Sequence, residues 1–191
     1  MKKVLVINAN PKSRSFCQLV AERYAATASA QHQVTLVHLA ALQFQADLSQ
    51  GYDEKQQLEP DLVGFQQQLL WAEHIVLICP VWWGGMPAKL KGLFDRVLLP
   101  GFAFAYLPGK SMPEQRLKGR TSELFLTLDT PVLWYKWWQG NPLYFQLTRT
   151  IFGFVGIKNQ ACHYFGPVMS ADADKRQRWL DKVQQLAARP G

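Results

Sequence analysis

Cysteine is scarce in this sequence, and long apolar runs are absent. Its 191 residues include only three cysteines, Cys17, Cys79 and Cys162. An odd number of widely spaced thiols without a C-x-x-C pair signals neither a disulfide framework nor a zinc site. The apolar run after Lys2 and Lys3 ends at Ile7, too short for the core of a signal peptide, and no stretch approaches the roughly 18 apolar residues of a membrane span. We therefore expect a soluble protein of the reducing cytoplasm.

Acidic residues are also few. The 14 Asp and Glu residues against 21 Lys and Arg residues give a net charge of +7. This charge favours anionic partners such as phosphorylated cofactors, nucleic acid or a membrane surface. The four histidines show no metal-ligand spacing, and the neighbouring Cys162 and His163 point to opposite faces of an expected strand. We predict no metal site.

The rest of the composition is that of a globular protein. Hydrophobic residues make up 48% of the chain and aromatic residues 13%, with 13 Gly and 11 Pro, which argues against a disordered or low-complexity chain. At about 150 residues per domain, residues 1–191 are expected to form a single domain.

Short, unbroken apolar runs alternate with segments of helical periodicity. The five runs are residues 4–7, 34–37, 75–79, 124–128 and 161–165. Unbroken runs are typical of strands buried on both faces of a parallel sheet. Helical periodicity begins near residues 15, 62, 87 and 170, whereas the polar segment 40–60 is expected to be a surface excursion. The pattern predicts an α/β fold with a parallel sheet and right-handed crossovers.

Ligands of an open α/β sheet bind beyond the carboxyl ends of its strands, and three loops there hold unusual residues. The first loop, 8–16, places hydroxyls, an amide and two cations before a helix start, whose unpaired N–H groups suit a phosphate. The alternative for this loop is an ordinary helix cap. Cys17 lies near the same helix start, but no motif places a base beside it, so we predict no covalent role for this thiol.

The second and third loops suit a flat heteroaromatic ring. In the second loop, 80–87, Trp82 and Trp83 offer apolar faces, and the two glycines after them permit close approach of a ligand to the backbone. The alternative is that both tryptophans are packing residues. The third loop, 127–131, holds hydroxyls and the carboxylate of Asp129, which suit ring edges or else form an Asx or Pro turn. No G-x-G-x-x-G follows the first run, which argues against a nicotinamide-type Rossmann site.

Residues 10–16 and 80–97, taken together, resemble the flavodoxin-like NAD(P)H:quinone oxidoreductase family. The second block is the more specific of the two, and the likeness covers nearly the whole chain. The resemblance implies a flavodoxin-like fold with helices on both faces of a five-stranded parallel sheet in the order 2-1-3-4-5. It also implies a noncovalent flavin, with FMN favoured over FAD, and a homodimer whose interface completes each active site.

Carried over residue by residue, the resemblance assigns cofactor-binding positions to all three loops. They are Asn10, Lys12, Ser15, Phe16, Cys17, Pro80, Val81, Trp82, Trp83, Gly84, Gly85, Thr127, Leu128, Asp129 and Thr130. Catalytic roles fall on Tyr135 and Trp83. The chain departs from the family pattern at residues 129–131, where relatives have a Gly-rich pair, and at Asn141, where relatives have a histidine.

The function that the resemblance implies is ping-pong hydride transfer from NAD(P)H through the flavin to a quinone, azo or nitro acceptor. Two alternatives remain open at this point. The first is a one-electron flavin carrier, against which the net charge of +7 counts. The second is an ancillary subunit of a potassium efflux system, which would associate peripherally with a membrane transporter.

The segment 134–154 is rich in aromatic side chains interleaved with Lys136 and Arg149. Clustered apolar side chains of this kind mark an interface, a groove or a membrane contact. We predict a dimer interface lining the active site, with ordinary core packing and a membrane surface as alternatives. Three flavin-type loops leave little room for base stacking, so we predict no nucleic-acid partner.

Overall fold

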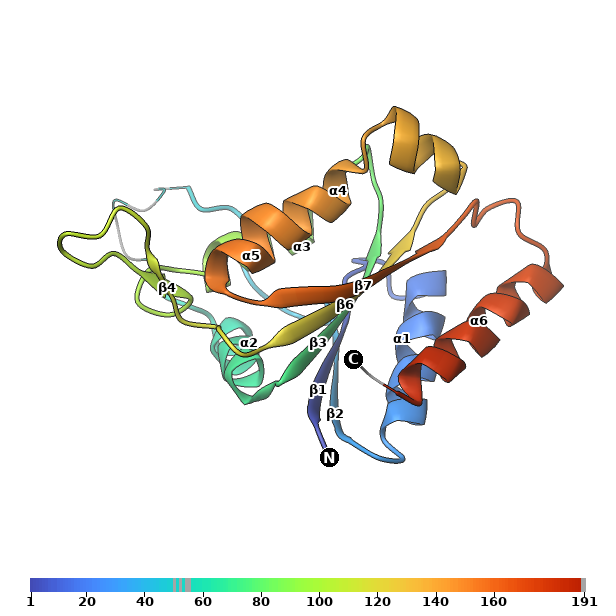
Figure 1. Ribbon diagram of the computed structural model, residues 1–191, viewed down its shortest axis with the longest axis horizontal. Coiled ribbons are helices and arrows are strands. Elements are labelled where there is room, and N and C mark those ends of the chain that lie inside the picture. Colours follow the sequence, from blue (N-terminus) through green and yellow to red (C-terminus); the bar gives the residue numbers. More distant parts are fainter. Residues whose placement is uncertain (50, 52, 54–55, 190–191) are drawn as a thin grey trace.

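Five parallel strands form one sheet in the order β2-β1-β3-β6-β7 in a computed structural model that describes residues 1–49, 51, 53 and 56–189 (Figure 1). The strands are β1 (Lys3–Asn8), β2 (Gln33–His38), β3 (His74–Pro80), β6 (Thr121–Thr127) and β7 (Lys158–Phe165). Each coincides with one of the unbroken apolar runs to within a few residues. The predicted order 2-1-3-4-5 is therefore confirmed for the main sheet.

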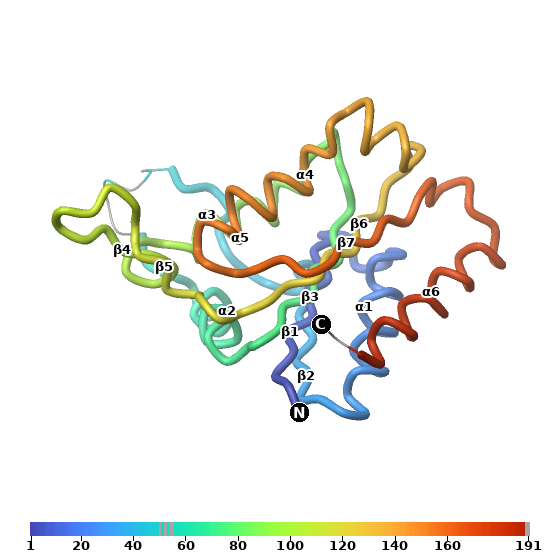
Figure 2. Tube along the Cα trace, viewed as in Figure 1, coloured from blue at the N-terminus to red at the C-terminus, as the bar shows by residue number. Residues whose placement is uncertain are grey.

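Helices cover both faces of this sheet, as predicted (Figures 1 and 2). The two on one face are α1 (Phe16–Ala28) and α6 (Ala173–Ala187), and the first two on the other are α2 (Pro60–Trp71) and α3 (Ala88–Val97). The strands supply both cores by alternation: Val4 and Val6 pack with α1, whereas Leu5 and Ile7 pack with α2 and α3. Burial on both faces explains why the runs are unbroken.

Two parts of the fold lie outside these expectations. The segment after the fourth strand coils into η1 (Trp134–Trp138), α4 (Pro142–Phe145), η2 (Gln146–Ile151) and α5 (Phe152–Val155), of which η1 and η2 are wide π turns. A small antiparallel pair, β4 (Phe104–Ala105) and β5 (Glu114–Gln115), projects from the main sheet. No helix in the described part of the chain is both long and apolar enough to cross a membrane.

Arg96 of α3 attaches the 40–60 excursion to the domain. Its guanidinium is buried, donates to the backbone carbonyls of Gln45 and Gln57, and lies 2.8 Å from the Glu59 carboxylate. A buried cation requires such partners, because burial without them costs several kcal/mol. The described part of this excursion is therefore held in place by a buried charge.

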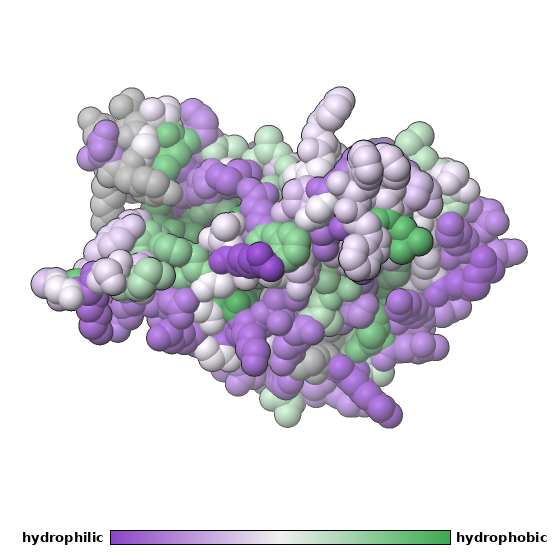
Figure 3. Space-filling model, turned by 45° about the horizontal axis from the view of Figure 1, so that its top comes forward, coloured by the Kyte–Doolittle hydropathy of each residue, from purple (hydrophilic) through white to green (hydrophobic). Residues whose placement is uncertain are grey.

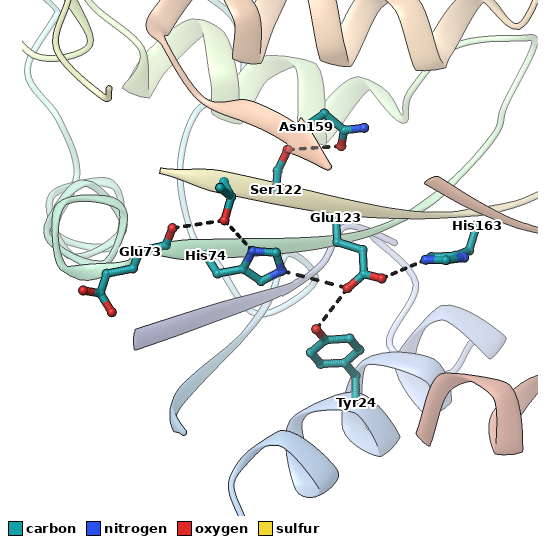
Figure 4. Close-up of polar contacts among 8 residues, drawn as sticks. Tyr24, Glu73, His74, Ser122, Glu123, Asn159 and His163 are labelled. Atoms are coloured by element: carbon teal, nitrogen blue, oxygen red, sulfur yellow. Dashed lines mark hydrogen bonds and ion pairs between the residues drawn. The ribbon is translucent and has the colours of Figure 1, made fainter. Parts of the chain in front are cut away.

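A second buried polar cluster surrounds Glu123, toward the amino end of β6 (Figure 4). The Tyr24 hydroxyl donates to its Oε2 at 3.0 Å, and His163 Nε2 lies 2.7 Å from its Oε1. His74 Nε2 lies 3.9 Å from Oε2, within ion-pair range. Burial alone raises the pKa of a carboxyl, but contacts from His163, His74 and Tyr24 outweigh burial and lower the pKa of Glu123 to about 2.

We predict that Glu123 makes the fold acid-sensitive. Because its pKa falls from the ordinary 4.5 to about 2 on folding, the carboxylate contributes up to about 3 kcal/mol of stability above pH 4.5, and this is lost as the pH falls toward 2. Glu123→Gln should lower the free energy of unfolding at pH 7 by about 2 kcal/mol. Urea unfolding at several pH values should show that the difference in the free energy of unfolding between the variant and the unsubstituted protein becomes smaller below pH 4.5.

The exposed carboxylate of Glu22 on α1 provides the matched control. Glu22→Gln should change the stability at pH 7 by less than about 0.5 kcal/mol, as is usual for surface substitutions. If the difference in the free energy of unfolding between Glu123→Gln and the unsubstituted protein stays constant from pH 7 to pH 3, the stabilising role of the Glu123 carboxylate is contradicted.

Candidate functional site

The three loops that the sequence singled out converge at one edge of the sheet. They follow β1, β3 and β6, which are neighbours in the sheet. Backbone hydrogen bonds continue past the strand ends: Ala9 donates to Ile78, and Val81 donates to Thr127, each at 2.8 Å. From β1 the chain crosses to β2 on one side of β1, whereas β3, β6 and β7 lie on the other side of it. This change of side is a topological switch point, and ligands bind at such points in open α/β sheets.

The first loop forms tight turns that expose its cations. The Asn8 side chain accepts from the Asn10 backbone at 3.2 Å, and the Asn10 side chain accepts from the Lys12 backbone at 2.9 Å. Ser15 caps α1 by accepting from Gln18 at 3.2 Å, so the helix-cap interpretation is correct for this residue. The first turn of α1 has no acidic residue, so its positive end remains suited to an anion.

A further cation reaches this loop from the last helix. Arg176 of α6 and Arg14 line one hollow of about 370 Å³ beside the start of α1. The Arg176 guanidinium donates to the carbonyl of Val168 at 3.0 Å, which orients it. Sequence reasoning missed Arg176, because it lies more than 150 positions from the loop that it joins and matches no motif.

The side chains of Phe16 and Cys17 are packing groups. The Phe16 ring lies 5.6 Å from the Trp179 ring, and Cys17 Sγ lies 3.2 Å from Thr127 Oγ1, which links the first loop to the third. Burial raises the pKa of the Cys17 thiol, so the side chain is uncharged at neutral pH. These two residues can meet a ligand through their backbone N–H groups at the start of α1.

The second loop is a tight turn that presents an aromatic side chain to solvent. Trp82 and Gly85 exchange two backbone hydrogen bonds of 2.9 Å, and the residues between them have positive φ angles, 52° at Trp83 and 78° at Gly84. Positive φ is rare and strained for an aromatic residue, and such strain gathers at functional sites. Trp83 is fully exposed and Trp82 is about half exposed. The interpretation of both as ordinary packing residues is therefore wrong.

A cavity of about 540 Å³ lies where the second and third loops meet the segment after η1. Its lining residues are Val81, Trp83, Gly84, Leu128, Thr130, Gln139 and Pro142. A second hollow of about 590 Å³ shares Trp83, Gly84 and Pro142 with the first and extends to η2. Both volumes are typical of small-molecule sites.

The third loop is held rigidly by the strand beside it. Leu128 donates to Phe165 and accepts from Val168, each at 3.0 Å. Asp129 is exposed, and its Oδ1 accepts from the Met169 backbone at 2.7 Å. The loop therefore has the fixed geometry that positions Thr130 at the cavity.

Tyr135 connects the turn of the second loop to the segment after η1. It is buried, its hydroxyl accepts from the Leu143 backbone at 3.1 Å, and that hydroxyl donates to the Gly84 carbonyl at 3.4 Å. Burial raises the pKa of Tyr135 to about 12, so the hydroxyl stays protonated at neutral pH. This hydroxyl orients the backbone on which Gly84 lines the cavity.

Asn141, where the family pattern has a histidine, is buried in a left-handed backbone conformation with φ of 53°. Its Nδ2 donates to the Tyr164 hydroxyl at 2.6 Å, and its Oδ1 has no hydrogen-bond partner among the described residues. A buried acceptor without a partner is costly. Sequence reasoning noted Asn141 as a departure but did not find Tyr164.

An apolar groove of about 640 Å³ continues from these hollows along α3, η2 and α5. It shares Gln146 and Thr150 with the second hollow, and Phe94, Tyr106 and Phe154 line it farther on. The aromatic segment 134–154 is thus divided: Tyr135 and Phe152 are buried in the core, Phe154 lines the groove, and the tryptophans of η1 are exposed. The alternative of core packing therefore holds for Tyr135 and Phe152, and a dimer interface lining the active site stays a prediction for the rest of the segment.

Comparison with known proteins gives three informative similarities. A Haemophilus influenzae protein named an uncharacterized NAD(P)H oxidoreductase is 31% identical over 189 residues, which cover 95% of this chain and 92% of the relative. The structure of an NAD(P)H:quinone oxidoreductase from Methanothermobacter marburgensis superposes with a TM-score of 0.78 at 21% identity, covering 100% of this chain and 99% of that one. An FMN-dependent NADH-azoreductase from Bacillus anthracis, in complex with FMN, gives a TM-score of 0.71 at 21% identity, covering 99% of each chain.

The two structural similarities support the fold alone, because their identities are low. The family described by a flavodoxin-like fold matches residues 2–187, which is nearly the whole chain. Strand order, the three converging loops and the family match agree, and the chain belongs to the flavodoxin-like family of oxidoreductases.

Proposed function

We propose that this protein is a flavin-dependent NAD(P)H:quinone oxidoreductase. The observation that supports the proposal most is the meeting of three loops at the switch point, with a cavity of about 540 Å³ at the second and third of these loops. The Haemophilus relative is named an NAD(P)H oxidoreductase, and the Methanothermobacter structure is named an NAD(P)H:quinone oxidoreductase. FMN is the proposed flavin, supported by the azoreductase that was solved with it.

The residues present fit such a cofactor in three respects. The start of α1, with Lys12 and Arg14 exposed beside it, suits a phosphate. The turn at Trp83 and Gly84 presents backbone N–H groups next to a cavity whose lining mixes apolar and polar side chains, which suits a flat heteroaromatic ring. Thr130, with Asp129 beside it, offers polar atoms for the ring edge.

A bound flavin supplies a two-electron carrier: NAD(P)H is oxidised to NAD(P)⁺, and a quinone takes up hydride and one proton to become a hydroquinone. The chain's own residues bind and align. Trp83 lines the cavity, and its exposed side chain is available to pack against a bound ring. Tyr135 acts through the Gly84 carbonyl by holding the turn in place. We propose that NAD(P)H and the acceptor bind in turn in the same cavity, with azo and nitro compounds as further acceptors.

We further propose that a second copy of this chain completes the site. The apolar groove continues from the second hollow and is open to solvent, with Tyr106 at one end. A surface of aromatic and aliphatic side chains is typical of homodimer interfaces.

We predict that the purified protein carries a bound flavin. The purified protein should be yellow, and heat should release FMN, identified by chromatography against FMN and FAD standards. Release of FAD would correct the choice of flavin. A colourless protein that also fails to bind added FMN or FAD would contradict the proposed function.

Gly84→Val should weaken FMN binding at least tenfold. Its φ of 78° disfavours any side chain, and a Cβ would lie 3.5 Å from Pro142 Cγ at the cavity. Gly109→Val is the matched control, because Gly109 has a φ of 76° but open space around it. Titration of the apoprotein, followed by flavin fluorescence, measures both. Equal affinities for the two variants would remove Gly84 from the site.

Light scattering should report twice the chain mass of 21.8 kDa. Tyr106→Glu should shift the protein toward monomer, because Tyr106 lines the groove. Met112→Glu, at a residue that is equally exposed at 71% but lies outside the groove lining, should leave the mass unchanged. A monomeric unsubstituted protein, or equal effects of the two substitutions, would contradict this interface.

A further inference from the structure

The first turn after the third loop presents four large apolar side chains to solvent, and we call them the tryptophan knob. Leu133 is 71% exposed, Trp134 50%, Trp137 80% and Trp138 75%. The rings of Trp134 and Trp138 stack with centroids 5.1 Å apart. Tyr135, in the same turn, is buried and anchors η1 to the core. One side chain of the turn therefore faces inward while its neighbours face outward.

The knob projects from the molecule. Figure 1 shows η1 as the gold coil at the top right, beyond the carboxyl ends of β3 and β6. Figure 3 turns this edge forward and shows pale, bulky side chains raised on this face, with both hydrophobic and hydrophilic side chains beside them. A convex shape distinguishes the knob from the concave groove along α3 and η2 that we propose for the second copy.

The charge of this region complements an anionic surface. No Asp or Glu occurs anywhere from Thr130 to Ala171, whereas Lys136 and Arg149 do. Lys136 belongs to η1 itself, and its Nζ lies 5.1 Å from the centre of the Tyr164 ring, so the cation stays next to the knob. Asp129 precedes the segment, and its Oδ1 accepts a hydrogen bond from the Met169 backbone. The tryptophans are therefore accompanied by positive charge.

Tryptophan and lysine on one exposed turn match the interface of a lipid bilayer. Indole rings settle at the level of the lipid headgroups, because one part of the ring is apolar and the N–H is polar. Cations near them are attracted to anionic lipids by about 1 kcal/mol each. Buried apolar area and electrostatic attraction together give reversible binding to the surface.

We propose that the tryptophan knob docks this protein on an anionic membrane surface. Leu133, Trp137 and Trp138 enter the headgroup region, and Lys136 contacts the lipid charge. Gln139, which follows the knob, lines the candidate cavity, so docking places the mouth of that cavity near the membrane. The inference concerns where the protein binds and holds whether or not the proposed reaction does.

The test is cosedimentation of the full chain with vesicles of phosphatidylcholine, with and without 30% phosphatidylglycerol. The unsubstituted protein should bind the anionic vesicles and be released as salt rises, because electrostatic attraction is screened. The double variant Trp137→Ser/Trp138→Ser and the single variant Lys136→Glu should each lower the partition coefficient at least tenfold. Thermal unfolding of each variant checks that it folds.

Two control substitutions lie on the β4–β5 hairpin, which Figure 1 shows at the opposite end of the molecule from η1. Met112→Ser removes an exposed apolar side chain, and Lys110→Glu reverses an exposed charge, both away from the knob. Neither should lower the partition coefficient more than about twofold. If the double tryptophan variant fails to fold, Lys136→Glu against Lys110→Glu decides the question.

Three results would overturn the proposal. The first is no binding of the unsubstituted protein to anionic vesicles. The second is equal binding by the knob variants and their controls. The third is a change from dimer to monomer in light scattering of the double tryptophan variant, which would assign the knob to a second copy of this chain.

Discussion

The candidate site depends on the way three parallel strands end at one edge. The bonds from Ala9 to Ile78 and from Val81 to Thr127 extend the ladder past the strands, so each loop begins at a fixed place beside the next. Parallel strands all end on the same edge of the sheet. The chain adds β2 on one side of β1 and β3 on the other, and this change of side leaves a crevice at that edge. The helix start that we propose for a phosphate and the turn that we propose for a flat ring then lie next to each other.

Rigidity around the second loop is the other requirement. The strained backbone of Trp83 persists because paired hydrogen bonds close the turn and because Tyr135 bonds to the Gly84 carbonyl. The same buried tyrosine anchors η1, from which the tryptophan knob projects. One residue thus connects the geometry of the cavity to the surface that we assign to the membrane. The buried Tyr135 side chain therefore holds both the turn at Gly84 and the exposed tryptophans of η1 in place.

Much of the fold could be predicted from the sequence because burial on both faces leaves a simple pattern. The runs at Val4 and Ile75 show no alternation, and this pattern alone predicts central parallel strands. The three loops were found for the same reason, since each follows such a run. The flat-ring interpretation of the second loop also fits its exposed tryptophans.

Other features depend on contacts between distant positions, which a single sequence does not show. Arg176 approaches Arg14, and Tyr164 bonds to Asn141, only because the chain folds back on itself. The π turns of η1 leave no clear periodicity, so the sequence did not show which side chains of the segment 134–154 are buried and which are exposed. Arg96 lies within residues 80–97, which carry the family resemblance, but the sequence does not show which of residues 40–60 its buried guanidinium contacts.

The central claim is that the three loops bind one planar, phosphate-bearing group together. The most direct measurement is titration of the ¹⁵N-labelled apoprotein with FMN, following backbone amide signals. We expect the amides near Ser15, near Gly84 and near Thr130 to shift at the same FMN concentration, because one ligand contacts all three loops. Shifts confined to one loop, or different midpoints for different loops, would contradict the account.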